Sequence, residues 1–438
     1  MEQVRKVRYM DVVVFGAGPA GIAASISAAR EGRDVVLVEC RDKIGGVMSS
    51  CPGMMLGGGY PCGKTIGGFF EEFVQRMYLQ EPPVAERRRC GLENFGDEVV
   101  YEHEPAIAIL CGMLAEAGVT VHTNRIPDRV LMGDGTITGV EVVDPEGRDR
   151  FVSRIYIDCT GNGDVAAKAG VPWQIGNADH LMMGVSLTFT MEGVDWDRAF
   201  ADETDRYFTA YAAKGISEGR IHASIPRIYM LKGFRRGTAF FNTVTVTGVD
   251  GTDSDSVLKG TNEARGRVLQ LARFCTEVLP GFENSRIAFI GPSVGIRETR
   301  RLEGMYQLTY TDIAKATKFE DGIVACDNPL DEVFRDEDIP HSSHEPALVR
   351  GQYYTIPFRA LVPRHFDNLL FAGRNLSVDD KAFASVRGMP QCMLMGQAAG
   401  VGAAQAVRDG GAVQGLDGGL IANRLISQGV RGIGGVSL

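Results

Sequence analysis

Cysteine patterns typical of metal sites and redox centres are missing from this sequence. Its nine cysteines form no CxxC pair and no close cluster. This argues against zinc ribbons, iron–sulfur clusters and thioredoxin-like redox centres. An odd, scattered set of cysteines in a chain of 438 residues is typical of free thiols in a reducing compartment, so we expect a cytoplasmic protein.

A long uninterrupted apolar segment is also absent. The most apolar stretch, residues 12–29, has glycines and a proline at its centre and ends at Arg30. A spanning helix needs about 20 predominantly apolar residues. We therefore expect neither a membrane segment nor a secretory signal.

The sequence has fewer positively charged residues than negatively charged ones. Lysine and arginine total 46 against 55 aspartates and glutamates, a formal net charge of −9, whereas nucleic-acid binding depends on a positive surface. We expect no nucleic-acid partner. The residue in excess is glycine, with 55 copies, and glycine serves where backbone must approach a ligand closely, often one that carries phosphate. The length suits two or three globular domains.

The N-terminal fifty residues carry a buried strand, a glycine-rich turn, a helix and a second strand that ends at Glu39. In chain order these are residues 12–15, Gly16-x-Gly18-x-x-Gly21, residues 22–30 and residues 34–38. This order is that of a Rossmann-like dinucleotide-binding unit.

Each motif residue has a physical role in such a unit. Gly16 allows the tight turn, Gly18 lets backbone amides approach a pyrophosphate, and Gly21 lets the helix pack against the strand. The helix N-terminus attracts the anion, and Glu39 is placed to accept hydrogen bonds from an adenosine ribose.

Three further motifs resemble those of glutathione-reductase-like flavoproteins. The sequence Glu39-x-Arg41-x-x-x-Gly45-Gly46 is similar to their second FAD motif. Residues 155–164 resemble their strand-and-Thr-Gly motif, and residues 368–374 resemble the motif that delivers backbone to the pyrophosphate and ribityl region. A helix that begins at residues 388–390 would then lie beside the flavin ring.

The chain resembles the FAD-dependent oxidoreductase family more closely, over residues 10–408. The motifs that carry this resemblance are residues 295–304, 354–359 and 372–400. Relatives often have a histidine soon after the Ala-Gly-Arg motif, and residues 377–383 of this chain contain none, which puts a histidine role there in doubt.

The resemblance implies an α/β fold, in which a Rossmann-like FAD-binding domain with a mostly parallel sheet carries a mixed α+β substrate or cap domain. The implied cofactor is FAD. The expected FAD-binding residues are Gly16, Gly18, Pro19, Ala20, Gly21, Glu39, Cys40, Arg41, Gly45, Gly46, Val47, Ile126, Thr160, Gly161, Asp164, Gly373, Arg374, Gly388 and Met389.

The rest of the chain shows no second glycine motif between a strand and a helix, so we expect no separate NAD domain. Apolar patterns and turn residues predict helices at 105–117 and 263–278, and strands at 119–122, 130–132, 138–143, 150–158, 183–191 and 238–246. We therefore expect a discontinuous FAD-binding domain (residues 1–175 and 360–410), a substrate or cap domain (176–359) and a loose C-terminal tail with one short helix (411–438). Small residues along 396–403 predict a helix face for close packing.

Arg297, Tyr354 and Arg359 are the expected catalytic residues. Arg297 and Arg301 lie four apart and would share a helix face, and Glu298 could instead neutralise one of them. A guanidinium at Arg359 could bind a carboxylate, and the Tyr354 hydroxyl could pass a proton, or both could fix a domain interface.

We expect no metal at His341-x-x-His344, because the segment is polar and lacks the pattern of a metal site. Cys51 and Cys62 flank a glycine stretch that could pass near the flavin, which leaves a covalent cysteinyl–flavin bond conceivable.

The resemblance implies an enzyme that moves a hydride between FAD and a small organic substrate, and flavoproteins of this kind are often homodimers. Two other functions stay open at this point. One is a monooxygenase-like reaction, in which reduced flavin reacts with oxygen. The other is an RNA-associated or assembly flavoprotein without small-molecule turnover, which the net charge of −9 makes the weakest of the three.

Overall fold

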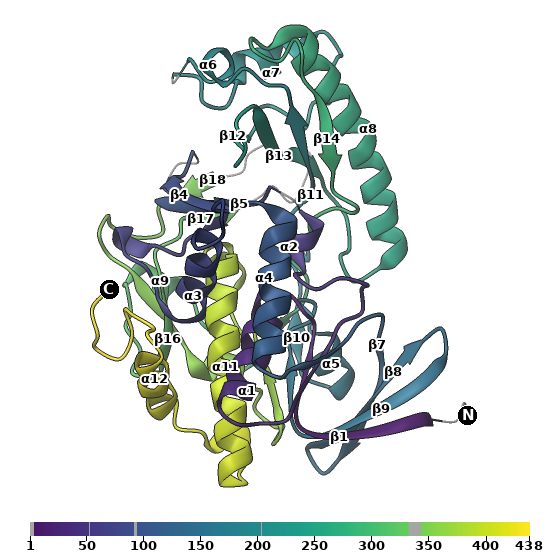
Figure 1. Ribbon diagram of the computed structural model, residues 1–438, viewed down its shortest axis with the longest axis vertical. Helices are drawn as coiled ribbons and strands as arrows, with labels where there is room; N and C mark the ends of the chain where they lie inside the picture. The colour runs from purple at the N-terminus through teal and green to yellow at the C-terminus, as the bar shows by residue number, and fades with distance from the viewer. Residues whose placement is uncertain (1–3, 52, 92–93, 203, 333–342) are drawn as a thin grey trace.

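In the computed structural model, a seven-stranded sheet forms the centre of the lower body of the molecule (Figure 1). Residues 4–51, 53–91, 94–202, 204–332 and 343–438 are described. The strand order is β6 (Thr120–His122), β2 (Val35–Val38), β1 (Val4–Phe15), β9 (Gly147–Asp158), β8 (Thr136–Asp144) and β7 (Ile126–Gly133), and β20 (Leu369–Phe371) pairs with the end of β9. Strands β6, β2, β1, β9 and β20 are parallel, whereas β7 and β8 form the expected antiparallel meander.

Both faces of this sheet are covered, and the alternation along β1 shows how. Val12 and Val14 lie in the apolar cluster that contains α1 (Pro19–Arg30), α4 (His103–Glu116) and α11 (Met389–Asp409). Val13 and Phe15 point to the other face and pack against the meander and α5 (Asp164–Ala169). A continuous apolar strand is required here because both of its faces are buried.

Helix α11 lies directly against α1, although almost the whole chain separates them. A Cβ atom on Gly396 would lie 2.0 Å from the Ala20 carbonyl oxygen, and one on Gly400 would lie 2.3 Å from that of Ala24. Only glycine fits at these two crossings. The predicted small-residue face of residues 396–403 is therefore confirmed.

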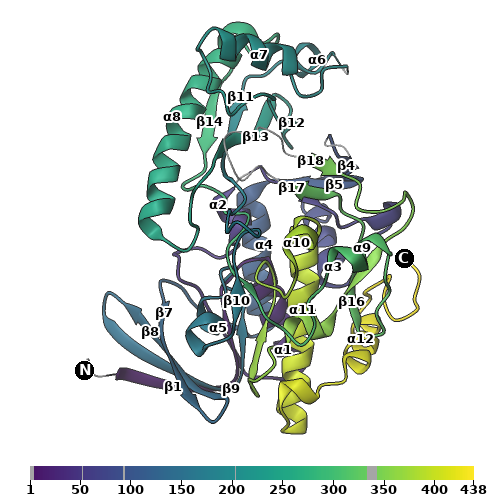
Figure 2. The same cartoon turned by 180° about the vertical axis from the view of Figure 1, so that it is seen from behind.

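The upper lobe (residues 185–296) has its own sheet and its own core. Its antiparallel sheet has the order β12 (Met230–Lys232), β13 (Thr238–Val246), β11 (Val185–Glu192), β14 (Arg286–Ile290), and α8 (Ser254–Val278) packs along one face. Figure 2 shows this sheet between α8 and the lower body. Helix α8 begins nine residues before the predicted start, since the Asp253 side chain caps it by accepting the amides of residues 255 and 256.

Shorter elements complete the two parts. They are α2 (Val47–Ser50), β3 (Leu56–Gly57), α3 (Gly68–Tyr78), β4 (Ala85–Arg89), β5 (Asp97–Tyr101), β10 (Trp173–Gln174), α6 (Trp196–Ala199), α7 (Thr209–Ser217), β15 (Arg301–Leu302), α9 (Tyr310–Ala314), β16 (Gly322–Cys326), β17 (Leu330–Glu332), β18 (Ser343–Glu345), β19 (Tyr354–Pro357), α10 (Asp380–Val386) and α12 (Gly418–Ser427). No helix of the described segments is long and apolar enough to cross a membrane.

The predicted fold class is confirmed: a mainly parallel sheet carries a second part that mixes strands and helices. The predicted domain limits stay predictions, and the apolar packing bears on them at one point. The core of the lower body contains Leu308, Ile323 and Phe358. Among the described residues, the last one that packs in the upper core is Ile296.

The prediction of a loose C-terminal tail is wrong. Leu425, Val430 and Ile433 are buried in the lower core, and the Gly68 amide donates to the Gly429 carbonyl. Glycine content suggested looseness, but the apolar side chains between the glycines anchor the segment.

Candidate functional site

A single cavity of about 970 Å³ runs from the lower body to the upper lobe. Its lower compartment is lined by the turns that follow β1, β2, β9 and β20, and by the N-terminus of α11. The upper compartment is lined by strands of the upper sheet and by residues 294–297. Ligands of doubly wound α/β folds bind at this carboxyl edge of the parallel strands.

The turn between β1 and α1 presents backbone to the lower compartment. Helix α1 starts after Gly18, no side chain caps it, and its first turn contains no acidic residue. The nearest atom to a Cβ on Gly18 would be the Gly46 Cα atom at 3.9 Å, so this side of Gly18 faces open space. Unpaired amides of a helix N-terminus in an open cavity suit a pyrophosphate.

Gly21 has a different role, because it is the contact between helix and strand. A Cβ atom there would lie 1.7 Å from the Gly16 carbonyl oxygen. Gly45 likewise lies behind the cavity wall, where its amide donates to the Ala17 carbonyl at 2.7 Å. Neither residue lines the cavity.

Glu39 follows β2 and is only 6% exposed. Its Oε2 atom accepts the Ala17 amide at 2.6 Å, and its Oε1 atom accepts the Arg41 amide at 2.9 Å. These bonds fix the carboxylate at the wall of the cavity. Since each carboxylate oxygen has two acceptor sites, Glu39 can still accept hydrogen bonds from a ribose.

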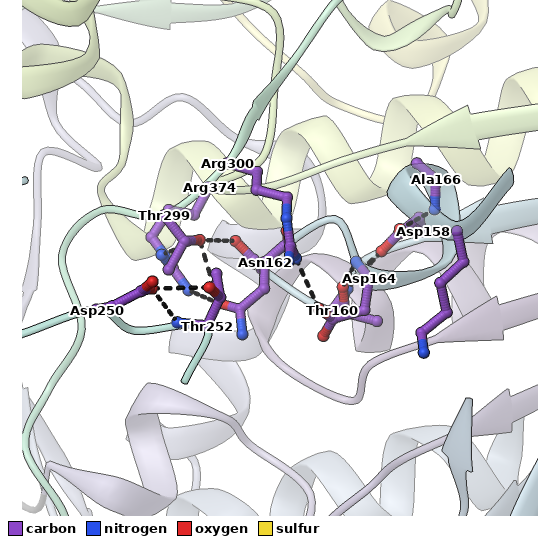
Figure 3. A network of polar contacts seen from close by, with 12 residues as sticks. Asp158, Thr160, Asn162, Asp164, Ala166, Asp250, Thr252, Thr299, Arg300 and Arg374 are labelled. Carbon is purple, nitrogen blue, oxygen red and sulfur yellow. Dashed lines mark hydrogen bonds and ion pairs between the residues drawn. The ribbon is translucent and has the colours of Figure 1, made fainter. Parts of the chain in front are cut away.

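The turn after β9 is organised by Asp158, which is fully buried. Its carboxylate accepts the Thr160 amide at 3.0 Å, the Thr160 hydroxyl at 2.7 Å and the Ala166 amide at 2.8 Å (Figure 3). Burial raises the pKa of Asp158 to about 6, against the opposing effect of these hydrogen bonds. The sequence motif contained Asp158, but its positioning role becomes visible only from these contacts.

Arg374 reaches across the same compartment from the turn after β20. Its guanidinium donates to the Asn162 Oδ1 atom at 2.7 Å and to the Thr299 hydroxyl at 2.8 Å (Figure 3). Arg300 pairs with Asp164 at 3.0 Å beside it. Asn162 also lines the cavity and was not among the predicted residues.

Helix α11 aims its N-terminus at the cavity. Gly388 is the N-cap, it has no side-chain cap, and Pro390 lies in the first turn. Gly388 and Met389 both line the cavity. A negative charge on a bound ligand would be stabilised at this helix end.

The structure therefore brings the expected FAD-binding residues together, with the exceptions of Gly21 and Gly45, around one cavity wall. Uncapped helix ends, glycine turns and a buried carboxylate fit a dinucleotide. Among wall residues that sequence reasoning missed are Ser50, Cys159 and Ala372, which lie next to motif residues.

The upper compartment contains Arg297 but neither of the other two expected catalytic residues. The Arg297 guanidinium donates to the Gly184 carbonyl at 2.9 Å, the Ser186 hydroxyl at 2.8 Å and the Asn242 Oδ1 atom at 3.3 Å. Desolvation lowers the pKa of Arg297 to about 10.

The predicted helix through Arg297 and Arg301 is wrong. Residues 296–300 form neither helix nor strand, and Gly295 forms a β-bridge to Ser186 of the upper sheet. Pro292 and Gly295 disfavour a helix just before this point. Arg301 instead forms a buried ion pair with Glu298.

Tyr354 lies in the lower core and is 0% exposed; its hydroxyl bonds to the Ser385 hydroxyl at 2.8 Å. Arg359 is half-exposed and pairs with Asp321 at 2.9 Å. Neither residue lines the cavity. The expectation that they contact a substrate there is corrected: β19 faces the core under α10, and the Arg359 side chain lies at the surface.

Of the two flanking cysteines, Cys51 lines the cavity and Cys62 does not. Burial raises the pKa of the Cys51 thiol. Among described residues no group of three histidines, cysteines or carboxylates could hold a metal. His341 lies outside the described residues. The backbone of His344, in β18, pairs with that of Asp331 in β17.

The chain is similar to known proteins over part of its length. The digeranylgeranylglycerophospholipid reductase 2 of Methanopyrus kandleri is 28% identical over 187 residues, which are 42% of this chain and 45% of that protein. The chain thus spans less than half the length of this relative.

Two solved structures are similar at the level of the backbone. The flavin-dependent brominase Bmp2 is 12% identical with a TM-score of 0.50, over 96% of this chain and 83% of that one. A geranylgeranyl bacteriochlorophyll reductase-like protein from Thermoplasma acidophilum is 14% identical with a TM-score of 0.48, over 92% and 80%.

The family model described as FAD dependent oxidoreductase matches residues 11–425, nearly the whole chain. That range contains the uncapped start of α1, Glu39, the turn around Asp158 and the start of α11. The chain therefore belongs to the FAD dependent oxidoreductase family, and it is an enzyme whose cofactor is FAD.

Proposed function

We propose that this enzyme transfers a hydride between FAD and a small organic substrate held against the upper sheet. The observation that carries the proposal is the continuous cavity, which joins the lower compartment with its uncapped helix ends to a second compartment in the upper lobe. When bound, FAD supplies the two-electron chemistry. The chain binds, orients and desolvates the reactants.

In this proposal the lower compartment holds the cofactor in the manner of glutathione-reductase-like flavoproteins. The amides at the start of α1 bind the pyrophosphate, and Glu39 binds the adenosine ribose. Ile126, which lines the cavity at the start of β7, contacts the adenine. The lower body thereby serves as the FAD-binding domain and the upper lobe as the substrate domain.

The start of α11 stabilises negative charge at the redox end of the cofactor. Gly388 and Met389 present the helix terminus to the cavity, and no described side chain caps it. A fixed dipole that already points at the developing charge needs no reorganisation during the reaction. Residues of the upper lobe line the opposite side of the cavity.

The test is an anaerobic screen of the purified, FAD-loaded protein with hydroxy acids, amino acids, amines and reduced nicotinamides. We expect at least one compound to bleach the visible flavin band, and its deuterated form to bleach it more slowly. A Gly18→Leu variant is the matched control. Its side chain fills the space beside Gly46 and should remove FAD while the apoprotein stays folded.

An alternative result separates hydride transfer from oxygen chemistry. If no compound bleaches the flavin through a deuterium-sensitive step, and the product contains oxygen from labelled O₂, the enzyme is a monooxygenase and the proposal fails.

A further inference from the structure

We propose that the upper compartment binds a small carboxylate substrate, and that Arg297 is the residue that anchors its carboxylate. This inference rests on the proposed function, because it assigns the substrate class of the same cavity. Four observations carry it: the polar side chains of the upper sheet, the bonding of Arg297, the balance of charges and one buried hydroxyl without a nitrogen or oxygen partner among the described residues.

The upper sheet is strongly two-sided. Its outer face, which includes Leu187, Phe241 and Val244, is fully buried in the upper core with α8. Its inner face presents Ser186, Thr188, Asn242 and Thr245 to the cavity. Phe240 of the same strand also lines the cavity, so the wall offers hydroxyl and amide groups to a ligand next to apolar surface.

A β-bulge creates this wall. Along β13, Phe241 pairs with Phe189 and Val244 pairs with Leu187, so Asn242 and Thr243 together face the single residue Thr188. If residues 241–246 alternated strictly, with no bulge, Thr245 would face away from the side that Asn242 occupies. Bulges often re-aim side chains at functional sites.

Arg297 is a partly buried cation whose hydrogen bonds all go to neutral groups. The acceptors of its guanidinium are a carbonyl, a hydroxyl and an amide oxygen, and it has no ion pair with any residue that the structure describes. Moving a charge out of water is costly unless an opposite charge compensates. The neutral acceptors orient the guanidinium, and an incoming carboxylate would supply the missing charge bidentately.

The charges around the upper compartment leave an excess of cations. Asp331 is the acid that lines it, and Asp331 pairs with Arg387 at 2.6 Å. Arg227 and Arg297 remain without an ion pair in the described part of the chain. A positive compartment inside a chain of net charge −9 attracts an anion.

Thr188 supplies the fourth observation. Its hydroxyl is buried beside the Cys51 thiol and has no nitrogen or oxygen partner among described residues. A thiol is only a weak hydrogen-bond partner, so the hydroxyl can still form a stronger bond. A ligand that lies between Thr188 and Arg297 would satisfy it.

The same wall favours a carboxylate over a phosphate ester. Phosphates are usually bound by uncapped helix N-termini. The start of α8, which lines this compartment through Ser254 and Val257, is capped by the Asp253 carboxylate and carries Asp255 in its first turn. One planar guanidinium with flanking hydroxyls matches the two oxygens of a carboxylate.

The experiment measures binding without turnover, from the change that a ligand causes in the visible spectrum of the FAD-loaded protein. The probes are acetate, lactate, succinate and benzoate, their neutral amides, and inorganic phosphate. We expect at least one carboxylate to bind saturably, its amide to bind about tenfold or more weakly, and phosphate to bind more weakly still. Arg297→Gln should raise the dissociation constant of that carboxylate about tenfold or more, and Arg297→Lys should raise it less.

Arg286→Gln is the matched control, since Arg286 belongs to the same lobe and its side chain is 81% exposed. It should leave the dissociation constant unchanged. The inference is overturned if amides bind as tightly as carboxylates, if phosphate binds more tightly than every carboxylate, or if Arg297→Gln binds like the parent. If Arg297→Gln does not hold FAD, two other measurements test the inference. They are the dissociation constants of the carboxylate and its amide on the parent protein, and the dissociation constant of the carboxylate on Arg297→Lys.

The outcomes also separate this inference from the proposed function. Deuterium-sensitive bleaching by a neutral compound, with no carboxylate bound, would sink the carboxylate inference and leave hydride transfer intact. Binding of a carboxylate without bleaching by any reductant would support the carboxylate inference and contradict hydride transfer.

Discussion

The two compartments of the cavity are built from different parts of the polypeptide. In the lower body the wall consists largely of backbone, at Gly16, Gly18 and Gly46 and at the starts of α1 and α11. In the upper lobe it consists of side chains on strands and on the irregular segment that carries Arg297. The cofactor compartment is therefore fixed by backbone geometry that tolerates little change, whereas the substrate compartment can be altered one side chain at a time.

The substitution with the largest expected effect tests how little change the backbone around the cofactor compartment tolerates. We predict that Gly21→Ala lowers the free energy of unfolding by more than about 4 kcal/mol and abolishes FAD binding, because its Cβ would lie 1.7 Å from a carbonyl oxygen. Urea unfolding and flavin content are the measurements. Gly266→Ala on α8, where no atom lies within 4 Å, should instead stabilise by about 0.5–1 kcal/mol. Equal effects of the two changes would contradict the comparison.

The second prediction concerns pH and the carboxylate under the lower wall. Burial raises the pKa of Asp158 to about 6, so its contribution to stability is full below about pH 4 and is lost as the pH rises through 6. Relative to Asp158→Asn, the parent should lose up to about 3 kcal/mol between pH 4 and 7. Urea unfolding at several pH values measures this. The exposed Asp134→Asn serves as control, and a pH-independent difference would refute the prediction.

Glu39→Ala sharpens the cofactor side of the comparison. We expect FAD binding to weaken by about 1.5–3 kcal/mol, because the hydrogen bonds of a charged carboxylate to the ribose are lost. Titration of the apoprotein with FAD gives the dissociation constant. Glu146→Ala, with a side chain that is 80% exposed, should change nothing. If Glu39→Ala keeps FAD through dialysis as well as the parent, Glu39 does not bind the ribose.

Thr188→Val tests the substrate side with almost no change of shape. FAD content should stay that of the parent, while binding of the carboxylate probe should weaken by about 0.5–1.5 kcal/mol as one hydrogen bond is lost. The same spectral titration measures both. Loss of FAD in this variant would mean that the two compartments are not independent.

Arg359→Ala should have the smallest effect. Arg359 lies outside the cavity, and its ion pair with Asp321 is half-exposed, so we expect a stability change below about 1 kcal/mol and an unchanged rate of flavin reduction. A slower reduction with full FAD content would restore the catalytic role that the sequence suggested.

The same contrast explains what could be predicted from the sequence. Gly16, Glu39 and Thr160 were found because each lies in a short motif directly after a strand, where local spacing fixes the geometry. Asn242 and Thr188 could not be found, since a bulge in strand pairing brings together residues far apart in sequence. The expected place of Tyr354 in the cavity differs from the structure for a related reason. Its motif is local, but packing determines which face of β19 meets the core.

The contact between α1 and α11 has a consequence for the synthesis of the chain. The cofactor compartment needs β20 and the start of α11, which a ribosome synthesises after the whole upper lobe. The upper lobe, residues 185–296, is finished well before that and has its own apolar core. A nascent chain would therefore carry a folded substrate lobe before it can retain FAD, and truncation ahead of residue 389 would yield a colourless polypeptide.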